Sequence, residues 1–264
     1  MTQASGKWSD LVVRMGSAAA MVVVGLGGVA LGGHVFHVMA ALICGLMVWE
    51  LVRMLKPAAP GVPVSLGALA GFSTLLSIYL PIGFALPILL APAMVGFGQL
   101  ERNRTVYMIF TTMVLLAGFG MMHVRDDMGF VWMLWLVMVV VVTDVVGYFA
   151  GRFIGGPKFW PKVSPKKTWS GTGFGWIGAA IVGVCFVSAT GTSMQLVGIS
   201  IAVSMASQMG DIAESAIKRR MDVKDSSDLI PGHGGLLDRF DGMLGASVFV
   251  LAVGPFVDVL PVIG

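Results

Sequence analysis

Acidic, basic and glycine residues are concentrated near the end of the chain, in the stretch GDIAESAIKRRMDVKDSSDLIPGHGGLLDRFDG, residues 210–242. Only 12% of all residues are charged, so this concentration needs a reason. Asp238 and Asp241 are three residues apart and share one face of a helix that has begun by then. With Asp211 they offer the carboxylate oxygens that Mg²⁺ prefers, while the adjacent lysines and arginines suit phosphate neutralisation. The stretch therefore predicts a metal-dependent phosphate site.

The helix that precedes this stretch is predicted to carry a polar face. At about 100° per residue, one third of its circumference collects seven polar side chains: Ser204, Ser207, Gln208, Asp211, Glu214, Ser215 and Lys218. Such a face cannot meet lipid without leaving polar groups unpaired, so it must line a cavity or pack against other polar residues. Asp144, inside another apolar run, is also expected to face a partner or a wet cavity. An interhelical hydrogen bond is the structural alternative for Asp144.

The elements that must position these residues are membrane helices. Mean hydropathy is +0.89, and 56% of the residues are apolar. A bilayer core of about 30 Å requires about 20 apolar residues per helix. Nine runs fit: 12–31, 34–54, 62–80, 82–99, 105–122, 130–151, 172–192, 194–216 and 243–262. The sequence predicts an all-α integral membrane protein with about nine transmembrane helices, forming one polytopic domain over 1–264 with N-terminal helices in 1–125 and a catalytic half in 126–264.

The basic residues predict the orientation of these spans. Of the 17 lysines and arginines, all but Arg125 fall at the N-terminus or in the loops on its side of the membrane. Because positive residues favour the inner side, the N-terminus is predicted to be cytoplasmic and the C-terminus periplasmic or external. The two chemically mixed loops, 151–175 and the one after 194–216, then share the cytoplasmic face. A single site at that face is expected.

The residues from Ser215 to Asp241 carry a more specific pattern. They read SAIKRRMDVKDSSDLIPGHGGLLDRFD and resemble the signature of phosphatidate cytidylyltransferases, also called CDP-diacylglycerol synthases. The segments DVVGYFAGRFIGG and SPKKTWSG are also similar to segments of this family. Ser170 stands where the family usually has Glu, so no role for that carboxylate is carried over. In the N-terminal half, the likeness is limited to hydrophobicity.

The resemblance implies an Mg²⁺-dependent nucleotidyltransferase that converts CTP and phosphatidate into CDP-diacylglycerol and pyrophosphate at the bacterial inner membrane. A second cation is left open, a homodimer is expected, membrane lipids are partners, and no nucleic-acid partner is expected. The implied catalytic residues are Asp211, Asp238, Lys218, Arg219, Lys224, Asp225, His233, Arg239 and Asp241. The implied substrate-binding residues are Asp144, Tyr148, Ser164, Lys166, Lys167, Thr168, Ser215, Gly234 and Gly235. Asp211, Asp238 and Asp241 are the implied metal ligands.

Three alternatives stay open at this point. The basic cluster Lys218–Arg220 could serve topology alone, and His233 could simply hydrogen-bond its loop. A transporter or channel would use Asp144 and Asp211 as coupling groups, but it predicts polar residues across the whole membrane rather than at one side. A CTP-dependent lipid-alcohol kinase would also bind a nucleotide and a lipid.

Overall fold

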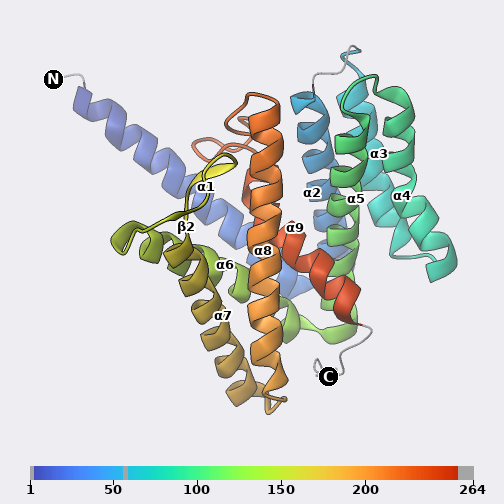
Figure 1. Cartoon of the computed structure of the whole chain (residues 1–264). Coiled ribbons are helices and arrows are strands. Elements are labelled where there is room, and N and C mark those ends of the chain that lie inside the picture. The colour runs from blue at the N-terminus through green and yellow to red at the C-terminus, as the bar shows by residue number, and fades with distance from the viewer. Residues whose placement is uncertain (1–2, 56–58, 255–264) are drawn as a thin grey trace. The chain divides into compact units, whose positions relative to one another are not determined.

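The computed structural model describes residues 3–55 and 59–254, with side chains from residue 13 onward. The helices in these ranges are α1 (Gln3–Leu31), α2 (Gly33–Met54), α3 (Val62–Ser77), α4 (Ile82–Gln99), α5 (Arg104–His123), α6 (Phe130–Phe153), α7 (Trp169–Thr190), α8 (Gln195–Arg220) and α9 (Leu237–Val253). A π-helical turn, Val124–Met128, follows α5. Two short strands, β1 (Lys158–Trp160) and β2 (Ser164–Thr168), stand between α6 and α7 (Figure 1).

Each of the nine predicted spans overlaps one of these helices. Within the described ranges, seven helices are long and apolar enough to cross a membrane, namely α1 from Val13, α2, α4, α5 with its π-helical turn, α6, α7 and α8. Helix α3 has 16 residues and α9 has 17 described residues, and the last predicted span, 243–262, extends beyond residue 254. The prediction of a helical membrane protein is therefore confirmed. The count of nine crossings and the orientation of the termini stay predictions.

The chain divides into two compact units that do not follow the sequence order. The first unit comprises Met1–Thr111 together with Met221–Phe240, and the second comprises Thr112–Arg220 together with Asp241–Gly264. The signature stretch is thus shared, because its middle part belongs to the first unit and its two ends belong to the second. The predicted division of one membrane domain near residue 125 stays a prediction.

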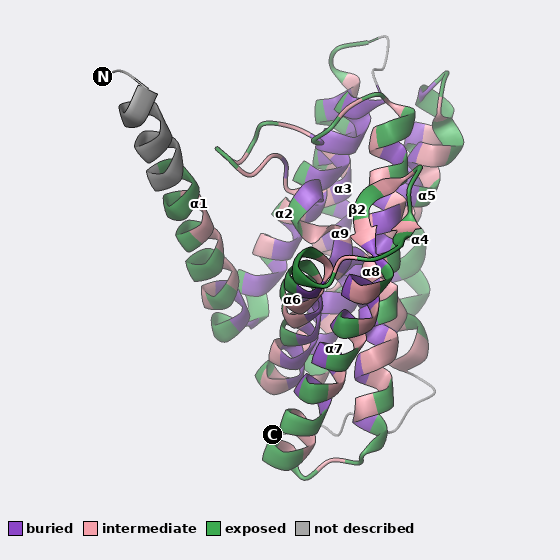
Figure 2. Cartoon of the chain, turned by 60° about the vertical axis from the view of Figure 1, so that its left-hand side comes forward, coloured by how far each residue is buried: buried purple, intermediate pink, exposed green. Residues whose placement is uncertain are grey.

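Small residues bring helices into close contact within each unit. In the first unit, a Cβ atom on Gly45 of α2 would lie 2.9 Å from the carbonyl oxygen of Gly67 on α3. In the second, a Cβ atom on Gly171 of α7 would lie 2.6 Å from the carbonyl oxygen of Gly147 on α6. Such backbone contact is how helices associate in lipid, where no hydrophobic force drives them together. Helix α1, by contrast, is exposed along most of its described side chains (Figure 2).

The loop after α6 contains a small sheet that the sequence did not predict. Strands β1 and β2 pair antiparallel, with Lys158 opposite Thr168 and Trp160 opposite Ser164. A two-stranded hairpin consists only of edge strands, so it tolerates the prolines of this segment. The rings of Phe159 and Trp169 lie 4.6 Å apart between centroids and pack the hairpin against the start of α7. The segment 151–175 is therefore an ordered element, which fixes where its lysines lie.

Candidate active site

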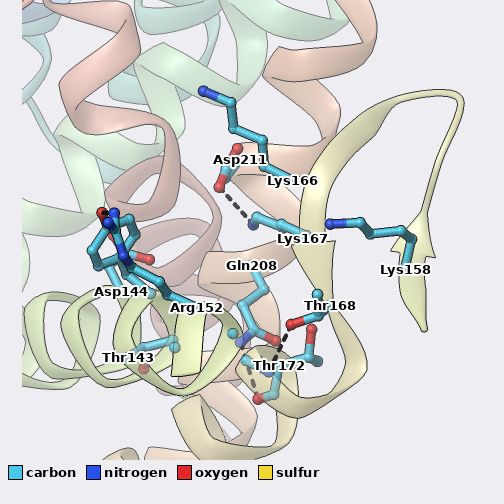
Figure 3. A pocket seen from close by; sticks show the side chains of 14 residues that line it. Thr143, Asp144, Arg152, Lys158, Lys166, Lys167, Thr168, Thr172, Gln208 and Asp211 are labelled. Carbon is cyan, nitrogen blue, oxygen red and sulfur yellow. Dashed lines mark hydrogen bonds and ion pairs between the residues drawn. The ribbon is translucent and has the colours of Figure 1, made fainter. Parts of the chain in front are cut away.

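A cavity of about 480 Å³ opens in the second unit, between α6, the β hairpin, α7 and α8 (Figure 3). Its lining is formed by Thr143, Asp144, Gly147, Tyr148, Gly151, Arg152, Lys158, Lys166, Lys167, Thr168, Gly171, Thr172, Gln208 and Asp211. Four of these side chains are cationic and two are carboxylates. A cavity with this excess of positive charge is suited to a polyanion such as a triphosphate.

The hairpin delivers three of the four cations. Lys158 lies on β1, and Lys166 and Lys167 lie next to each other on β2 (Figure 3). The ammonium nitrogen of Lys167 lies 2.5 Å from a carboxylate oxygen of Asp211 on α8. On α6, a guanidinium nitrogen of Arg152 donates to the hydroxyl of Tyr148 at 2.9 Å. The structure therefore brings together Asp144, Tyr148, Lys166, Lys167, Thr168 and Asp211, which the sequence assigned to one site from separate segments.

Thr168 connects the hairpin rigidly to the next helix. It is the N-cap of α7, and its Oγ1 accepts a hydrogen bond from the Gly171 N–H at 3.1 Å. The hydroxyl of Ser170 lies 3.0 Å from Thr168 Oγ1 and donates to the carbonyl oxygen of Gly155. Ser170 thus ties α7 to the loop that follows α6. Ser164, also predicted to bind substrate, pairs with Trp160 at the other end of β2, and the cavity lining described above does not include it.

The polar face of α8 is used in two ways. Deeper along the helix, Ser204 accepts from the Thr143 hydroxyl at 2.8 Å. Gln208 accepts from the Trp176 indole at 3.0 Å and donates to the carbonyl oxygen of Thr172 at 3.2 Å. These contacts hold α8 against α6 and α7. Nearer the C-terminal end of α8, the face turns to the cavity through Asp211.

The last two turns of α8 hold further predicted residues. The Ser215 hydroxyl donates to the second carboxylate oxygen of Asp211 at 3.2 Å. Lys218 forms an ion pair with the fully buried Glu214, at 2.6 Å between nitrogen and oxygen. Arg219 is exposed at the end of the helix. Ser215 therefore supports Asp211 directly, while the Lys218 ammonium group is engaged by Glu214.

Asp241, two residues before the last predicted span, belongs electrostatically to the same group of acids. Burial, followed by the negative charges of Asp211 and Asp144, raises the pKa of the Asp241 carboxyl to about 7. Its Oδ1 accepts from the Gly242 N–H at 2.7 Å. The carboxylates of Asp144, Asp211 and Asp241 lie close enough to repel one another, and such a group favours a cation nearby.

The carboxylates fit the chemistry of Mg²⁺ without forming a closed protein cage. Among residues 3–55 and 59–254, no group of three or more His, Cys, Asp or Glu side chains is arranged to hold a metal ion. Mg²⁺ normally takes only one or two carboxylates and completes its shell with water and substrate phosphates. Asp211 and Asp241 provide such oxygens in the second unit. The metal assignment of Asp211, Asp238 and Asp241 stays a prediction.

Asp238 has a structural task in the first unit. It is buried, and its Oδ2 accepts from the Ser226 N–H at 2.8 Å, the Ser226 hydroxyl at 2.9 Å and the Gly235 N–H at 2.8 Å. These bonds hold the signature loop, residues 221–236 between α8 and α9, against the start of α9. Within that loop, Gly234 has a φ of 80°, a conformation that residues with a Cβ rarely adopt.

His233 is tied to α1. Its Nδ1 lies 2.8 Å from the hydroxyl of Ser17, which also donates toward the carbonyl oxygens of Pro231 at 3.0 Å and Arg14 at 3.1 Å. The single hydroxyl proton of Ser17 serves one of these acceptors at a time, and whether Nδ1 donates or accepts depends on the tautomer of the His233 ring. The His233 ring thus contacts Ser17 of α1, and the hydrogen bond of this ring to its own loop stays a prediction.

The remaining signature residues are exposed, namely Lys224, Asp225 and Arg239 of the first unit. The sequence analysis missed several residues that belong to the site: Thr143, Arg152, Lys158, Thr172 and Gln208 line the cavity. It also missed Glu50, whose fully buried carboxylate contacts the signature loop. A signal for Glu50 was present, because it is a single ionisable residue in the apolar run 34–54, and such residues are functional candidates by default.

The fold and the site define a helical membrane protein with a cavity that is lined by four cationic side chains and two carboxylates. Residues 12–256 match the model of the cytidylyltransferase family, and the chain therefore belongs to that family. The phosphatidate cytidylyltransferase of Staphylococcus haemolyticus is 34% identical over 232 residues, which cover 81% of this chain and 87% of that protein. These matches confirm the resemblance carried by the signature.

Two further relatives align over about half of this chain. The phosphatidate cytidylyltransferase of Brucella abortus is 42% identical over 132 residues, covering 49% of this chain and 48% of that protein. That of Bacillus subtilis is 38% identical over 128 residues, covering 47% of this chain and 48% of that protein. The chain thus aligns with about half the length of these two relatives.

Proposed function

We propose that this chain transfers CMP from CTP to phosphatidate, giving CDP-diacylglycerol and pyrophosphate. The observation that carries the proposal is the cavity lined by Arg152, Lys158, Lys166 and Lys167 together with Asp144 and Asp211. Membership of the cytidylyltransferase family and the names of the relatives support the same activity. The cavity volume of about 480 Å³ is in the range of small-molecule sites.

The proposed reaction needs no nucleophilic side chain, because a phosphate oxygen of phosphatidate is already an anionic nucleophile. It attacks the α-phosphorus of CTP. As the new P–O bond forms, the bond from the α-phosphorus to the oxygen that bridges to the β-phosphorus breaks, and pyrophosphate leaves with the electron pair. Most of the barrier arises from bringing two anions together in line and from charge building on the leaving group.

The cationic side chains address both parts of this barrier. Lys166 and Lys167 come from one strand that is paired with β1, so they can hold the triphosphate in one orientation. Arg152 and Lys158 add charge at the same cavity and reduce the repulsion between the two anionic substrates. Tyr148, which accepts from Arg152, sets the direction of that guanidinium group.

Mg²⁺ is the proposed cofactor, with Asp211 and Asp241 of the second unit as its carboxylate ligands, and Asp238 is added from the family resemblance alone. When bound, it would neutralise the phosphate charge that develops during transfer. The raised pKa of Asp241 and the lysine paired with Asp211 support a cationic partner for these acids. Whether a second cation takes part is left open.

The proposed location is the bacterial inner membrane, with the site facing the cytoplasm. The bias of lysines and arginines toward one set of loops supports this orientation. CTP would then enter from the cytosol, while phosphatidate would remain in the bilayer. A homodimer is proposed from the family resemblance alone.

Membranes that contain the protein, incubated with CTP, Mg²⁺ and phosphatidate, test the proposal. Pyrophosphate release that depends on both CTP and phosphatidate is the expected result. The proposal would be rejected if pyrophosphate were released without phosphatidate, or if no more pyrophosphate were released than from membranes that lack the protein. The kinase alternative is tested by adding a lipid alcohol in place of phosphatidate. A kinase would transfer a phosphate from CTP to that alcohol.

A further inference from the structure

The carboxylate of Glu50 on α2 is surrounded by donors from the signature loop of the first unit. The Leu236 N–H donates to its Oε1 at 3.0 Å, and the Leu237 N–H donates to its Oε2 at 2.7 Å. The hydroxyls of Ser227 and Ser226 lie 2.5 Å and 3.4 Å from Oε1 and Oε2. The Glu50 side chain is fully buried. Both of its oxygens are therefore occupied by hydrogen-bond donors.

These contacts make Glu50 a cap for a helix other than its own. Helix α9 begins at Leu237, and the first N–H groups of a helix have no partner within it. The N-terminal end of a helix also favours a negative charge. Glu50 supplies both an acceptor and a charge at the start of α9. Burial of a carboxylate is tolerated when it is hydrogen-bonded in this way.

Glu50 also explains why glycine occupies position 235. A Cβ atom there would lie 2.0 Å from the Ser226 hydroxyl oxygen and 2.6 Å from Glu50 Oε1. The same Ser226 hydroxyl donates to Asp238 Oδ2 at 2.9 Å. Glu50, Ser226 and Asp238 therefore form one connected, buried network around Gly235, and only a residue without a side chain fits at its centre.

We propose that Glu50 is a positioning residue for the catalytic signature, a role that rests on the proposed function. Its carboxylate fixes the residue at which α9 begins and the conformation of Ser226–Leu237. That conformation sets the direction of Asp238 and of Arg239, which follow directly in the helix. Glu50 does not act on substrate itself, since its oxygens are used by the loop. The contact thereby links α2 to a signature that lies almost 200 residues later in the chain.

Glu50→Gln tests the role with Glu101→Gln as matched control, because Glu101 is an exposed glutamate of the same unit. The glutamine amide turns one acceptor into a donor that faces the N–H and hydroxyl donors of the loop. We expect kcat to fall about tenfold to a hundredfold, with the KM for CTP changed less than about threefold. Glu101→Gln should leave both values unchanged. Wild-type kcat in Glu50→Gln would overturn the proposal.

Hydrogen exchange separates this proposal from the proposed function. In the purified full chain, Glu50→Gln should accelerate amide exchange in peptides covering residues 226–240 and leave peptides of α6–α8 unchanged. Unchanged exchange in 226–240 would overturn the positioning role even if activity fell. If wild-type protein showed no transfer activity, the proposed function would fail while the exchange result would still decide the contact. If Glu50→Gln does not fold, Glu50→Asp is measured in its place, because aspartate keeps the carboxylate on a shorter side chain. Amide exchange in peptides covering residues 226–240 should again be faster than in wild type. Unchanged exchange in these peptides would also overturn the role.

Discussion

The ammonium group of Lys167 on β2 and the carboxylate of Asp211 on α8 form an ion pair of 2.5 Å. The two side chains are 23% and 28% exposed, so the pair lies at the wall of the cavity rather than in bulk water. Lys167 comes from the loop 151–175 and Asp211 from the predicted span 194–216, so the pair joins two separate segments of the sequence. In the proposed reaction each changes partner, because Lys167 turns to substrate phosphate and Asp211 to Mg²⁺. The pair therefore keeps both groups in place without substrate.

Lys167→Met should weaken the binding of CTP. The variant keeps the length of the side chain and removes the charge that faces the triphosphate, and a charged hydrogen bond contributes about 1.5–3 kcal/mol. We expect the KM for CTP to rise about tenfold or more, measured by steady-state pyrophosphate release. Lys162→Met is the control, because Lys162 lies in the turn of the same hairpin and is absent from the cavity lining. An equal rise in both variants would remove Lys167 from the nucleotide site.

Asp211→Asn should remove nearly all turnover while the protein still inserts and folds. The amide cannot replace a carboxylate as a ligand for Mg²⁺, and it also leaves Lys167 without its ion-pair partner. We expect a loss of more than about a hundredfold in kcat at saturating Mg²⁺. Asp222→Asn is the control, because Asp222 is exposed and has a φ of 54°, which asparagine also adopts. Near wild-type turnover in Asp211→Asn would refute the metal assignment.

Thr168→Val should loosen the junction between the hairpin and α7. Valine has a similar shape but cannot accept from the Gly171 N–H, and loss of an N-cap costs about 0.5–2 kcal/mol. A lower Tm in detergent is expected, together with a higher KM for CTP because Lys167 is the preceding residue. Thr168→Ser keeps the acceptor and should restore both values. If valine and serine variants behave alike, the cap is not what orders the hairpin.

Gly171→Ala should force α6 and α7 apart. The new methyl group would lie 2.6 Å from the Gly147 carbonyl oxygen, and overpacking of this kind costs about 1–3 kcal/mol. The matched control is Gly173→Ala on the same helix, where a Cβ atom meets nothing within 4 Å. Thermal unfolding of both variants in one detergent should show a lower Tm for Gly171→Ala alone. Equal Tm values would show that the helices can separate freely.

Most of the helices and part of the site could be predicted from local pattern. The predicted run 82–99 coincides with α4 (Ile82–Gln99), because a span needs only an uninterrupted apolar stretch. Asp144 and Asp211 were singled out because ionisable residues stand out in apolar helices, and Lys167 was added by the family resemblance. The structure brings these three residues to one cavity.

Long-range contacts and short strands could not be predicted. Glu50 and Leu236 are 186 residues apart, and no periodicity relates them. The three- and five-residue strands of the hairpin are too short to show alternation, and Pro165 within β2 argues against a strand in general. Asp238 was predicted as a metal ligand together with Asp241, because their spacing suggests a shared helix face. Its bonds to Ser226 and Gly235 depend on how the loop folds back.

The central claim is the transfer of CMP to a lipid phosphate, and the position of a radioactive label tests it most directly. Purified protein would be incubated with Mg²⁺, phosphatidate and CTP labelled either at the α- or at the γ-phosphorus. The α-label should appear in the lipid phase and the γ-label in pyrophosphate, in equal amounts and only when phosphatidate is present. Transfer of the γ-label to lipid, or no label in lipid from either nucleotide, would contradict the claim.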